Sequence, residues 1–189
     1  MQAKADLRLA MRERLKTLSA KDRDIESRII CKTLQKLIGD APELVTGYIP
    51  LSDEPNILPL LEHILKTGKK IALPTIESDA LAFRTVENLG QTIQNPITKL
   101  SEPLKTCPRT DPKHIAWVIV PGRAFTKQGD RLGRGNGGFD RWIALQRKEN
   151  PQTRYVGVCF ECQILPTLAI EPHDEKMNIV VTARTTTRM

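Results

Sequence analysis

The sequence has few aromatic residues, with Phe, Trp and Tyr making up 4% of 189 positions. That scarcity argues against a base-stacking surface of the kind that single-stranded nucleic acids need. Long apolar runs are missing too, since none approaches the roughly 18 residues of a membrane span. The first twenty residues, MQAKADLRLAMRERLKTLSA, lack the apolar core of a secretory signal, and Asp6 and Glu13 argue against a transit peptide. We therefore expect a cytoplasmic protein with no membrane partner.

Cysteine is also sparse, with four residues, of which Cys159 and Cys162 form the C-x-x-C segment CFEC. A zinc site would need two more ligands at suitable spacing, and the sequence offers neither a second pair nor a histidine cluster. A redox dithiol would sit where a strand meets the start of a helix, whereas CFEC continues the strand-like segment YVGV. We expect two reduced thiols around a buried strand, as is usual inside cells.

Positive charge, in contrast, is abundant: the net charge is +7 and the isoelectric point is about 9.4. This balance favours anionic partners, which include nucleic acids, phosphates and polycarboxylates. The length fits one domain covering residues 1–189. No internal repeat, low-complexity tract or linker divides the chain.

Apolar periodicity predicts a helix over residues 3–17 and a second helix from an N-cap at Ser19 to Gly39. Strand 44–50, a helix that begins in SDEPN (52–56) and ends near Lys66, and strand 69–74 then form the strand–helix–strand unit of a parallel sheet. Further elements follow from the same patterns: strands at 80–86, 115–122, 154–161 and 178–182, a helix from about Gly138 to Arg147, and a long irregular functional loop at 87–114. The fold class predicted is α/β and Rossmann-like: three layers, with a mainly parallel sheet and helices on both faces.

The segment RLGRGNGGFDRW (131–142) holds three arginines and four glycines, and it joins the strongest strand to a helix. Glycines let backbone N–H groups approach an anion closely, and a helix N-terminus after them completes a phosphate site. Arg131 and Arg134 add bidentate donors. Asp140, in the first turn of the helix, indicates a divalent metal, since a bare carboxylate would repel phosphates. The segment is neither a P-loop nor a dinucleotide fingerprint, so a flexible turn stays open as an alternative.

The longer segment VIVPGRAFTKQGDRLGRGNGGFDRW resembles the signature of the 5-formyltetrahydrofolate cyclo-ligase family, also called 5,10-methenyltetrahydrofolate synthetase. The other motifs of that family appear in the same order: KADLR, YIPLSDEPN, KKIALP, SEP, and VGVCFECQILPTLAIEPHDEKMNIVVT. The resemblance extends over nearly the whole chain and implies an ATP-dependent ligase of one-carbon folate metabolism. ATP would phosphorylate the formyl oxygen of 5-formyltetrahydrofolate, N10 would attack the activated carbon, and 5,10-methenyltetrahydrofolate, ADP and phosphate would leave.

The resemblance also implies roles for particular residues. ATP would bind Lys4, Arg8, Arg131, Leu132, Gly133, Arg134, Gly135, Asn136, Gly137, Gly138 and Phe139, and Arg134 would be catalytic. The reduced folate, with or without a polyglutamate tail, would bind Ile49, Glu54, Arg134 and Gly138, and Mg²⁺ would bind Asp140 and Asp174.

Plainer readings of several of these residues stay open. Lys4 and Arg8 could form a solvated basic helix face, and Glu54 could be a carboxylate at a helix start. Asp174 could be a turn residue, and its neighbour His173 is expected to be structural.

Three positions depart from the family pattern, and they motivate rival functions. Gly138 replaces an aromatic residue that would lie against the folate, Phe139 replaces a tyrosine, and Lys99 stands where a glycine is usual. One rival is a diverged paralogue that binds ATP but acts on another formylated or pterin-like compound, or only binds folate. The other is a nucleic-acid-binding module, for which charge is the sole support, so nucleic acid is not an expected partner.

Overall fold

The computed structural model describes residues 2–39, 44–96 and 100–189. A seven-stranded sheet forms its centre, in the order β12-β11-β9-β6-β1-β2-β3. The strands are β1 (Leu44–Thr46), β2 (Lys70–Glu77), β3 (Ala80–Val86), β6 (Ile115–Pro121), β9 (Arg154–Val158), β11 (Ile179–Val181) and β12 (Thr186–Arg188). Five of them run parallel, and the edge strands β3 and β12 pair antiparallel with β2 and β11.

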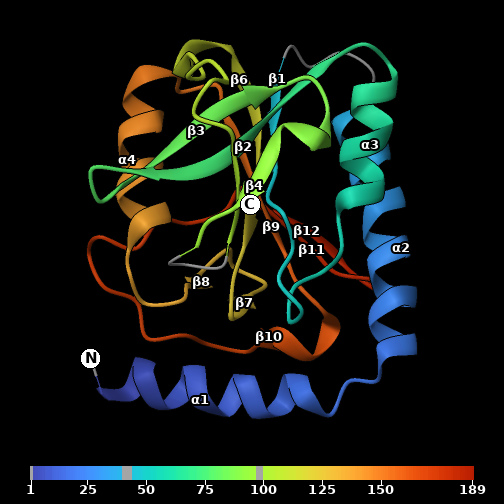
Figure 1. The fold of residues 1–189 in the computed structure, drawn as a ribbon. Helices are drawn as coiled ribbons and strands as arrows, with labels where there is room; N and C mark the ends of the chain where they lie inside the picture. The colour runs from blue at the N-terminus through green and yellow to red at the C-terminus, as the bar shows by residue number, and fades with distance from the viewer. Residues whose placement is uncertain (1, 40–43, 97–99) are drawn as a thin grey trace.

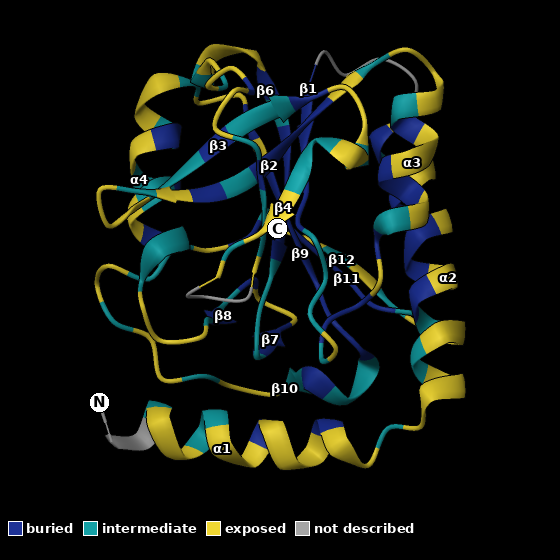
Figure 2. Cartoon of the chain, in the orientation of Figure 1, coloured by how far each residue is buried: buried dark blue, intermediate teal, exposed yellow. Residues whose placement is uncertain are grey.

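Helices cover both faces of this sheet (Figure 1). Helices α2 (Ala20–Ile38) and α3 (Leu58–Lys66) lie on one face, and α4 (Gly138–Glu149) lies on the other. Strand β6 alternates between the two layers: Trp117 and Ile119 pack in the core with α2 and α3, whereas Val118 and Val120 pack with Ile143 of α4. The expected three-layer α/β fold is confirmed, with the buried strands at its centre (Figure 2).

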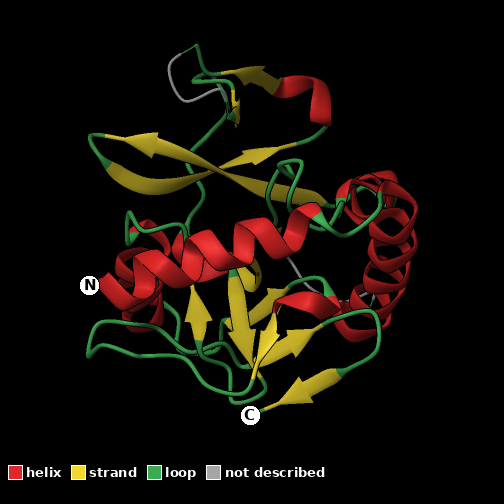
Figure 3. Ribbon diagram, turned by 90° about the horizontal axis from the view of Figure 1, so that it is seen from below, coloured by secondary structure: helices red, strands yellow, loops and turns green. Residues whose placement is uncertain are grey.

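Helix α1 (Gln2–Lys16) lies across one end of the sheet, as the view from below shows (Figure 3). Met11, one of its buried residues, packs against Ala124 and Leu132, which belong to a second, three-stranded sheet. That sheet has the order β10-β7-β8, from β10 (Ile164–Leu165), β7 (Ala124–Thr126) and β8 (Arg131–Leu132). The small sheet therefore seats α1 beside the arginine–glycine segment.

The segment after β1 departs from the expected strand and helix. Strand β1 ends at Thr46, and the N–H of Gly47 makes a last bond to the β2 carbonyl of Ala72 at 2.9 Å. The following residues form a turn, closed by a bond from the Glu54 N–H to the Leu51 carbonyl at 3.0 Å. Helix α3 begins only at Leu58, so the helix start expected in SDEPN is wrong.

The loop expected at 87–114 contains short regular elements in its described part. Strands β4 (Thr92–Gln94) and β5 (Ser101–Pro103) form an antiparallel pair, flanked by the 3₁₀ turns η1 (Leu89–Gln91) and η2 (Pro112–His114). The hydroxyl of Thr75 on β2 donates to the Glu102 carboxylate at 2.8 Å, which joins β5 to the main sheet. Among the described residues, no helix is both long and apolar enough to cross a membrane.

Candidate active site

A cavity of about 570 Å³ opens beyond the carboxyl ends of β1, β2 and β6. The chain runs from β1 through α3 to β2 on one side, and from β6 through α4 to β9 on the other. The boundary between β1 and β6 is thus the point where the strand order changes direction. In open α/β sheets such a point is the usual place for a ligand.

Every residue to which the sequence analysis gave a site role lines this one cavity. Their positions in the chain are far apart, and four elements bring them together: α1, the segment after β1, the β8–α4 segment, and the loop at 171–174. The members are Lys4, Arg8, Ile49, Glu54, Arg131, Leu132, Gly133, Arg134, Gly135, Asn136, Gly137, Gly138, Phe139, Asp140 and Asp174. An apolar wall of Pro74, Ile76, Leu81 and Leu100 lies in the same cavity.

Two glycines of the β8–α4 segment adopt backbone conformations that are unfavourable for residues with a side chain. Gly135 and Gly137 have φ angles of 110° and 63°, in the left-handed region. Gly137 is the N-cap of α4 and has no side chain with which to cap it. The Gly138 N–H donates to the Asn136 side chain at 3.2 Å, but the N-cap residue supplies no side-chain cap for the rest of the first turn, so the N-terminus of α4 suits an anion.

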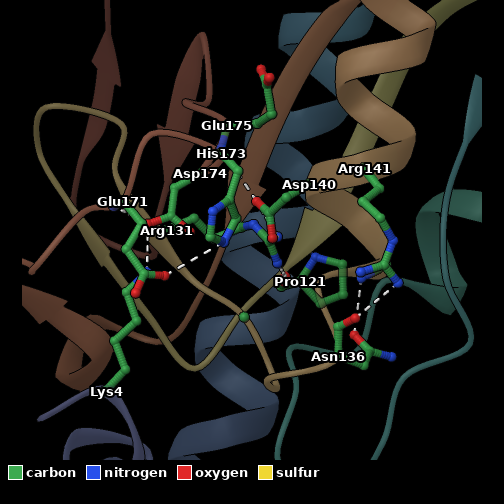
Figure 4. A network of polar contacts seen from close by, with 12 residues as sticks. Lys4, Pro121, Arg131, Asn136, Asp140, Arg141, Glu171, His173, Asp174 and Glu175 are labelled. Atoms are coloured by element: carbon green, nitrogen blue, oxygen red, sulfur yellow. Dashed lines mark hydrogen bonds and ion pairs between the residues drawn. The ribbon is translucent and has the colours of Figure 1, made fainter. Parts of the chain in front are cut away.

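Arg131 and Asp140 form a buried ion pair beneath this segment (Figure 4). The Nη2 atom of Arg131 lies 2.9 Å from both carboxylate oxygens, and the two side chains are 3% and 12% exposed. Asp140 also accepts a bond from the backbone N–H of Glu175 at 3.3 Å, and the Arg131 guanidinium lies 5.5 Å from the ring centre of Phe139. These contacts anchor the segment to α4, which argues against a merely flexible turn.

Lys4 lies between two carboxylates of the 171–174 loop (Figure 4). Its Nζ atom is 2.8 Å from Glu171 and 2.5 Å from Asp174, and its side chain is 12% exposed. Burial opposes the charged form, but the two carboxylates outweigh burial and raise the pKa of Lys4. For Asp174, burial is likewise outweighed by the Lys4 bond, which lowers the pKa of the carboxyl.

The same loop has a donor set that fits Mg²⁺. One ligand atom from each of Glu171, His173 and Asp174 can lie within 4.8 Å of the others. Asp140 lines the same cavity and adds a further carboxylate. Carboxylate oxygens are what Mg²⁺ prefers. Asp174 also closes a turn, because its carboxylate accepts the Glu171 N–H at 2.7 Å, so the turn and ligand readings are compatible.

Arg8 joins α1 to the glycine segment. Its Nε atom donates to the Gly133 carbonyl at 2.9 Å, and its side chain is partly buried. With Lys4 bound to the 171–174 loop, the reading of these two residues as a solvated basic face is wrong.

Glu54 faces the glycine segment across the cavity and hydrogen-bonds Arg134. The Nε and Nη2 atoms of Arg134 lie 3.1 and 2.8 Å from Glu54 Oε1. The other carboxylate oxygen accepts the Leu51 N–H at 3.0 Å. Since α3 begins four residues later, at Leu58, the reading of Glu54 as a helix-start carboxylate is wrong.

Sequence reasoning missed several polar residues around the cavity. Asp53 pairs with Arg134 and also with Arg123, and Glu171 shares Lys4. Asp53 and Glu171 stand one and three positions from predicted site residues, so proximity in the chain was an available signal. Nothing local marks Arg123, whose partner lies 70 positions away.

The departures from the family pattern have local structural consequences. Gly138 begins α4 with an ordinary φ, and a Cβ atom built there would meet only Asn136, at 3.6 Å or more. The Cβ atom of a larger residue at position 138 would therefore fit without a clash. Phe139 packs edge-on against Phe83, with ring centres 6.4 Å apart. Lys99 lies outside the described residues.

The C-x-x-C segment is separate from the cavity lining. Cys159 is buried directly after β9, and Cys162 lies in the 3₁₀ turn η3 (Glu161–Gln163). All four cysteines are free, and burial raises the pKa of both thiols in this segment. These properties fit the expected reduced thiols.

Comparison with known proteins converges on one family. Residues 1–183 match the model of the 5-formyltetrahydrofolate cyclo-ligase family. A 5-formyltetrahydrofolate cyclo-ligase of Mus musculus is 27% identical over 201 residues, which cover 95% of this chain and 93% of the mouse protein. The Escherichia coli K12 enzyme of the same name is 29% identical over 142 residues, covering 73% of this chain and 76% of its own. The solved structure of Aquifex aeolicus 5,10-methenyltetrahydrofolate synthetase superposes with a TM-score of 0.82 at 26% identity, covering 98% of this chain and 92% of its own.

Proposed function

Because the chain belongs to the 5-formyltetrahydrofolate cyclo-ligase family, we propose that it converts 5-formyltetrahydrofolate and ATP into 5,10-methenyltetrahydrofolate, ADP and phosphate. In this reaction the formyl oxygen attacks the γ-phosphorus of ATP, and ADP leaves. N10 then attacks the activated formyl carbon and loses its proton, and phosphate departs with the former formyl oxygen. This chemistry asks the protein to position two substrates and to stabilise developing charge.

One contact supports the proposal above all others: Arg134 of the glycine segment hydrogen-bonds Glu54 of the β1 side at 2.8 Å. It joins the part of the cavity that suits phosphates to the part that offers a fixed acceptor and apolar surface. We assign the γ-phosphoryl group to the Arg134 side and the pterin to the Glu54 side. Glu54 would then accept hydrogen bonds from the N–H groups of the pterin, and Ile49 would pack against its ring.

The glycine segment would wrap the phosphates of ATP. The positive-φ residues Gly135 and Gly137 have no Cβ atom to keep the phosphates away from the backbone, and the N-terminus of α4 contributes its dipole. Lys4 and Arg8 would approach from α1 with two further positive charges. The contact of Lys4 with the 171–174 loop would loosen when a cation binds those carboxylates and the phosphates bind the Lys4 ammonium.

Asp140 and Asp174 would hold Mg²⁺, with Glu171 beside them. When bound, the ion supplies charge neutralisation for the phosphate oxygens. The buried pair with Arg131 would keep Asp140 oriented for this role.

The proposal extends to the setting of the reaction. We place it in the cytoplasm, in keeping with the four free cysteines. The charge of +7 would favour folates that carry an acidic polyglutamate tail over the monoglutamate.

A second candidate rests on Gly138, which leaves space where the family has an aromatic residue. A diverged paralogue would bind ATP in the same segment but take another formylated or pterin-like compound. It predicts ATP binding without formation of methenyltetrahydrofolate.

Absorbance in the methenyl-folate band, followed with purified protein, ATP, Mg²⁺ and 5-formyltetrahydrofolate, tests the proposal. We expect ATP-dependent growth of the band, lost in Asp140→Ala, and a fall of at least about 100-fold in kcat for Arg134→Ala. Arg28→Ala, at an exposed arginine paired with Asp24 on α2, is the matched control and should keep the wild-type rate. If wild-type protein binds ATP by calorimetry but forms no methenyl product, the paralogue is the better account.

A further inference from the structure

Arg134 hydrogen-bonds two neighbouring carboxylates, those of Glu54 and Asp53. The Nη2 atom of Arg134 lies 2.6 Å from Asp53 Oδ1 and 2.8 Å from Glu54 Oε1. Its Nε atom also bonds Glu54, at 3.1 Å. Among the described residues Nη1 has no hydrogen-bond partner, so one edge of the guanidinium is held and the other keeps its donors.

Asp53 is itself held from the far side by Arg123, whose Nη1 atom pairs with Asp53 Oδ2. The Arg123 side chain is 15% exposed and that of Asp53 is 24% exposed. Burial alone would raise the pKa of the Asp53 carboxyl, but bonds from Arg123 and Arg134 outweigh it and lower the pKa. Asp53 is thus a charged link between two arginines.

Both ends of this link are fixed to the framework. The N–H of Arg123 bonds the Leu132 carbonyl at 2.7 Å, and its carbonyl accepts from the side chain of Gln163, a fully buried residue, at 3.0 Å. The turn that bears Asp53 is tied to α2, because Arg23 donates to the Ser52 carbonyl at 2.6 Å. The link therefore rests on rigid elements rather than on a free loop.

Charge explains why two arginines are needed. Arg123, Asp53, Arg134 and Glu54 carry two positive and two negative charges, so the cluster is neutral. Under the proposed function, Glu54 turns its acceptor oxygens to the substrate, and Asp53 is then left to hold Arg134. Without Arg123, the three remaining side chains would carry a net negative charge beside the phosphates.

We propose that Asp53, held by Arg123, is a positioning residue that keeps Arg134 oriented toward the transferred phosphoryl group. Neither Asp53 nor Arg123 is among the described residues that line the cavity, so they act through Arg134 and not on the substrates. The inference rests on the proposed function, in which Arg134 stabilises the charge that develops during transfer.

A double-mutant cycle on kcat tests this inference. Asp53→Asn keeps the side-chain shape but removes the charge, and we expect kcat to fall at least tenfold, since misplacing a catalytic group is costly. The KM for ATP should change less than about threefold, because an interaction made only in the transition state affects kcat. In an Arg134→Ala background, the same substitution should change the single-turnover rate less than about twofold.

Arg123 provides an independent arm from outside the cavity. Arg123→Leu should lower kcat by at least about fivefold, and Arg123→Lys should recover most of that loss, because an ammonium can still pair with Asp53. Asp24→Asn is the matched control: it breaks another aspartate–arginine pair, exposed on α2, and should leave kcat unchanged.

The outcomes separate the two claims. If Arg134→Ala keeps the wild-type rate, the proposed role of Arg134 fails. If Arg134→Ala loses activity but the Asp53→Asn effect multiplies with it, or Arg123→Lys recovers nothing, the positioning role is overturned and the pair is a structural latch. Thermal unfolding of each variant shows whether the protein is still folded. If a variant has lost folded protein, the recovery of kcat in Arg123→Lys decides between the positioning role and the structural latch.

Discussion

Removal of Arg131 should destabilise the fold strongly, because its partner Asp140 is buried with it. We consider Arg131→Met, which keeps most of the unbranched stem but removes the guanidinium. Both oxygens of Asp140 lose a donor at 2.9 Å, in a place where the carboxylate side chain is only 12% exposed. One weaker bond remains, from the Glu175 N–H at 3.3 Å.

The size of the effect follows from the burial of the pair. Breaking a buried ion pair by removing one partner costs about 3–5 kcal/mol, since an uncompensated charge is left behind. For a chain of this length, that loss lowers Tm by about 6–20 °C. An exposed pair such as Arg28 with Asp24 contributes about 0.5 kcal/mol or less, so Arg28→Met is the control.

Urea unfolding of Arg131→Met, of Asp140→Leu and of the double variant measures these quantities. The double variant should recover at least about 1 kcal/mol relative to Arg131→Met, because it no longer buries an unpaired charge. A cost below about 1 kcal/mol for Arg131→Met, or a double variant no more stable than the single one, would refute the reasoning.

Three further predictions concern the site and its supporting sheet. Gly138→Tyr should lower the KM for the folate, because it restores an aromatic ring that would lie against the folate. A Cβ atom at this position meets Asn136 no closer than 3.6 Å, so the substitution causes no clash there. A higher KM in steady-state kinetics would mean that the pocket has been rebuilt around the glycine. Gly157→Ala should cost about 1–3 kcal/mol in urea unfolding, because its Cβ would lie 2.4 Å from Phe125 Cε1 in the core, and an unchanged midpoint would contradict that packing. Asp174 has a lowered pKa in the folded state, so its contribution to stability is present above about pH 3.9 and is lost as the pH falls through the folded value. Asp174→Asn should therefore lose less stability than wild type between pH 5 and about pH 2, and an identical loss in the two proteins would contradict the assignment.

The sequence could predict those elements whose determinants are local. Ser19 was expected to cap the second helix, and its hydroxyl accepts the Asp22 N–H at 3.1 Å. The apolar run at 115–122 predicted a buried strand, and β6 lies at the centre of the sheet. Very short elements escaped prediction, because strands of two or three residues such as β8 and β12 carry no periodicity and depend on a partner strand.

The helix start expected in SDEPN failed for a tertiary reason. The segment offered a capping serine and a proline, but the structure uses Glu54 to bind Arg134 and the Leu51 N–H. These contacts hold the chain in a turn, and the helix begins only at Leu58. A contact made 80 positions away thus overrides a local helix signal.

The residues of the candidate site also divide into those that the sequence could predict and those that it could not. The arginine–glycine segment indicates an anion by composition alone, and the family resemblance adds five other positions that line the cavity, namely Lys4, Arg8, Ile49, Glu54 and Asp174. Arg123 could not be predicted, because its role comes from a pair with Asp53 that only the fold creates. Such pairs leave no trace in one sequence.

The central claim is that the γ-phosphoryl group of ATP passes to the formyl oxygen in this cavity. The most direct measurement uses 5-formyltetrahydrofolate labelled with ¹⁸O in the formyl group and follows the label by mass spectrometry of the released phosphate. The account predicts one ¹⁸O atom in each phosphate, at the same rate as methenyltetrahydrofolate forms. Unlabelled phosphate together with methenyltetrahydrofolate would contradict it, because the formyl oxygen would then have left without accepting the phosphoryl group.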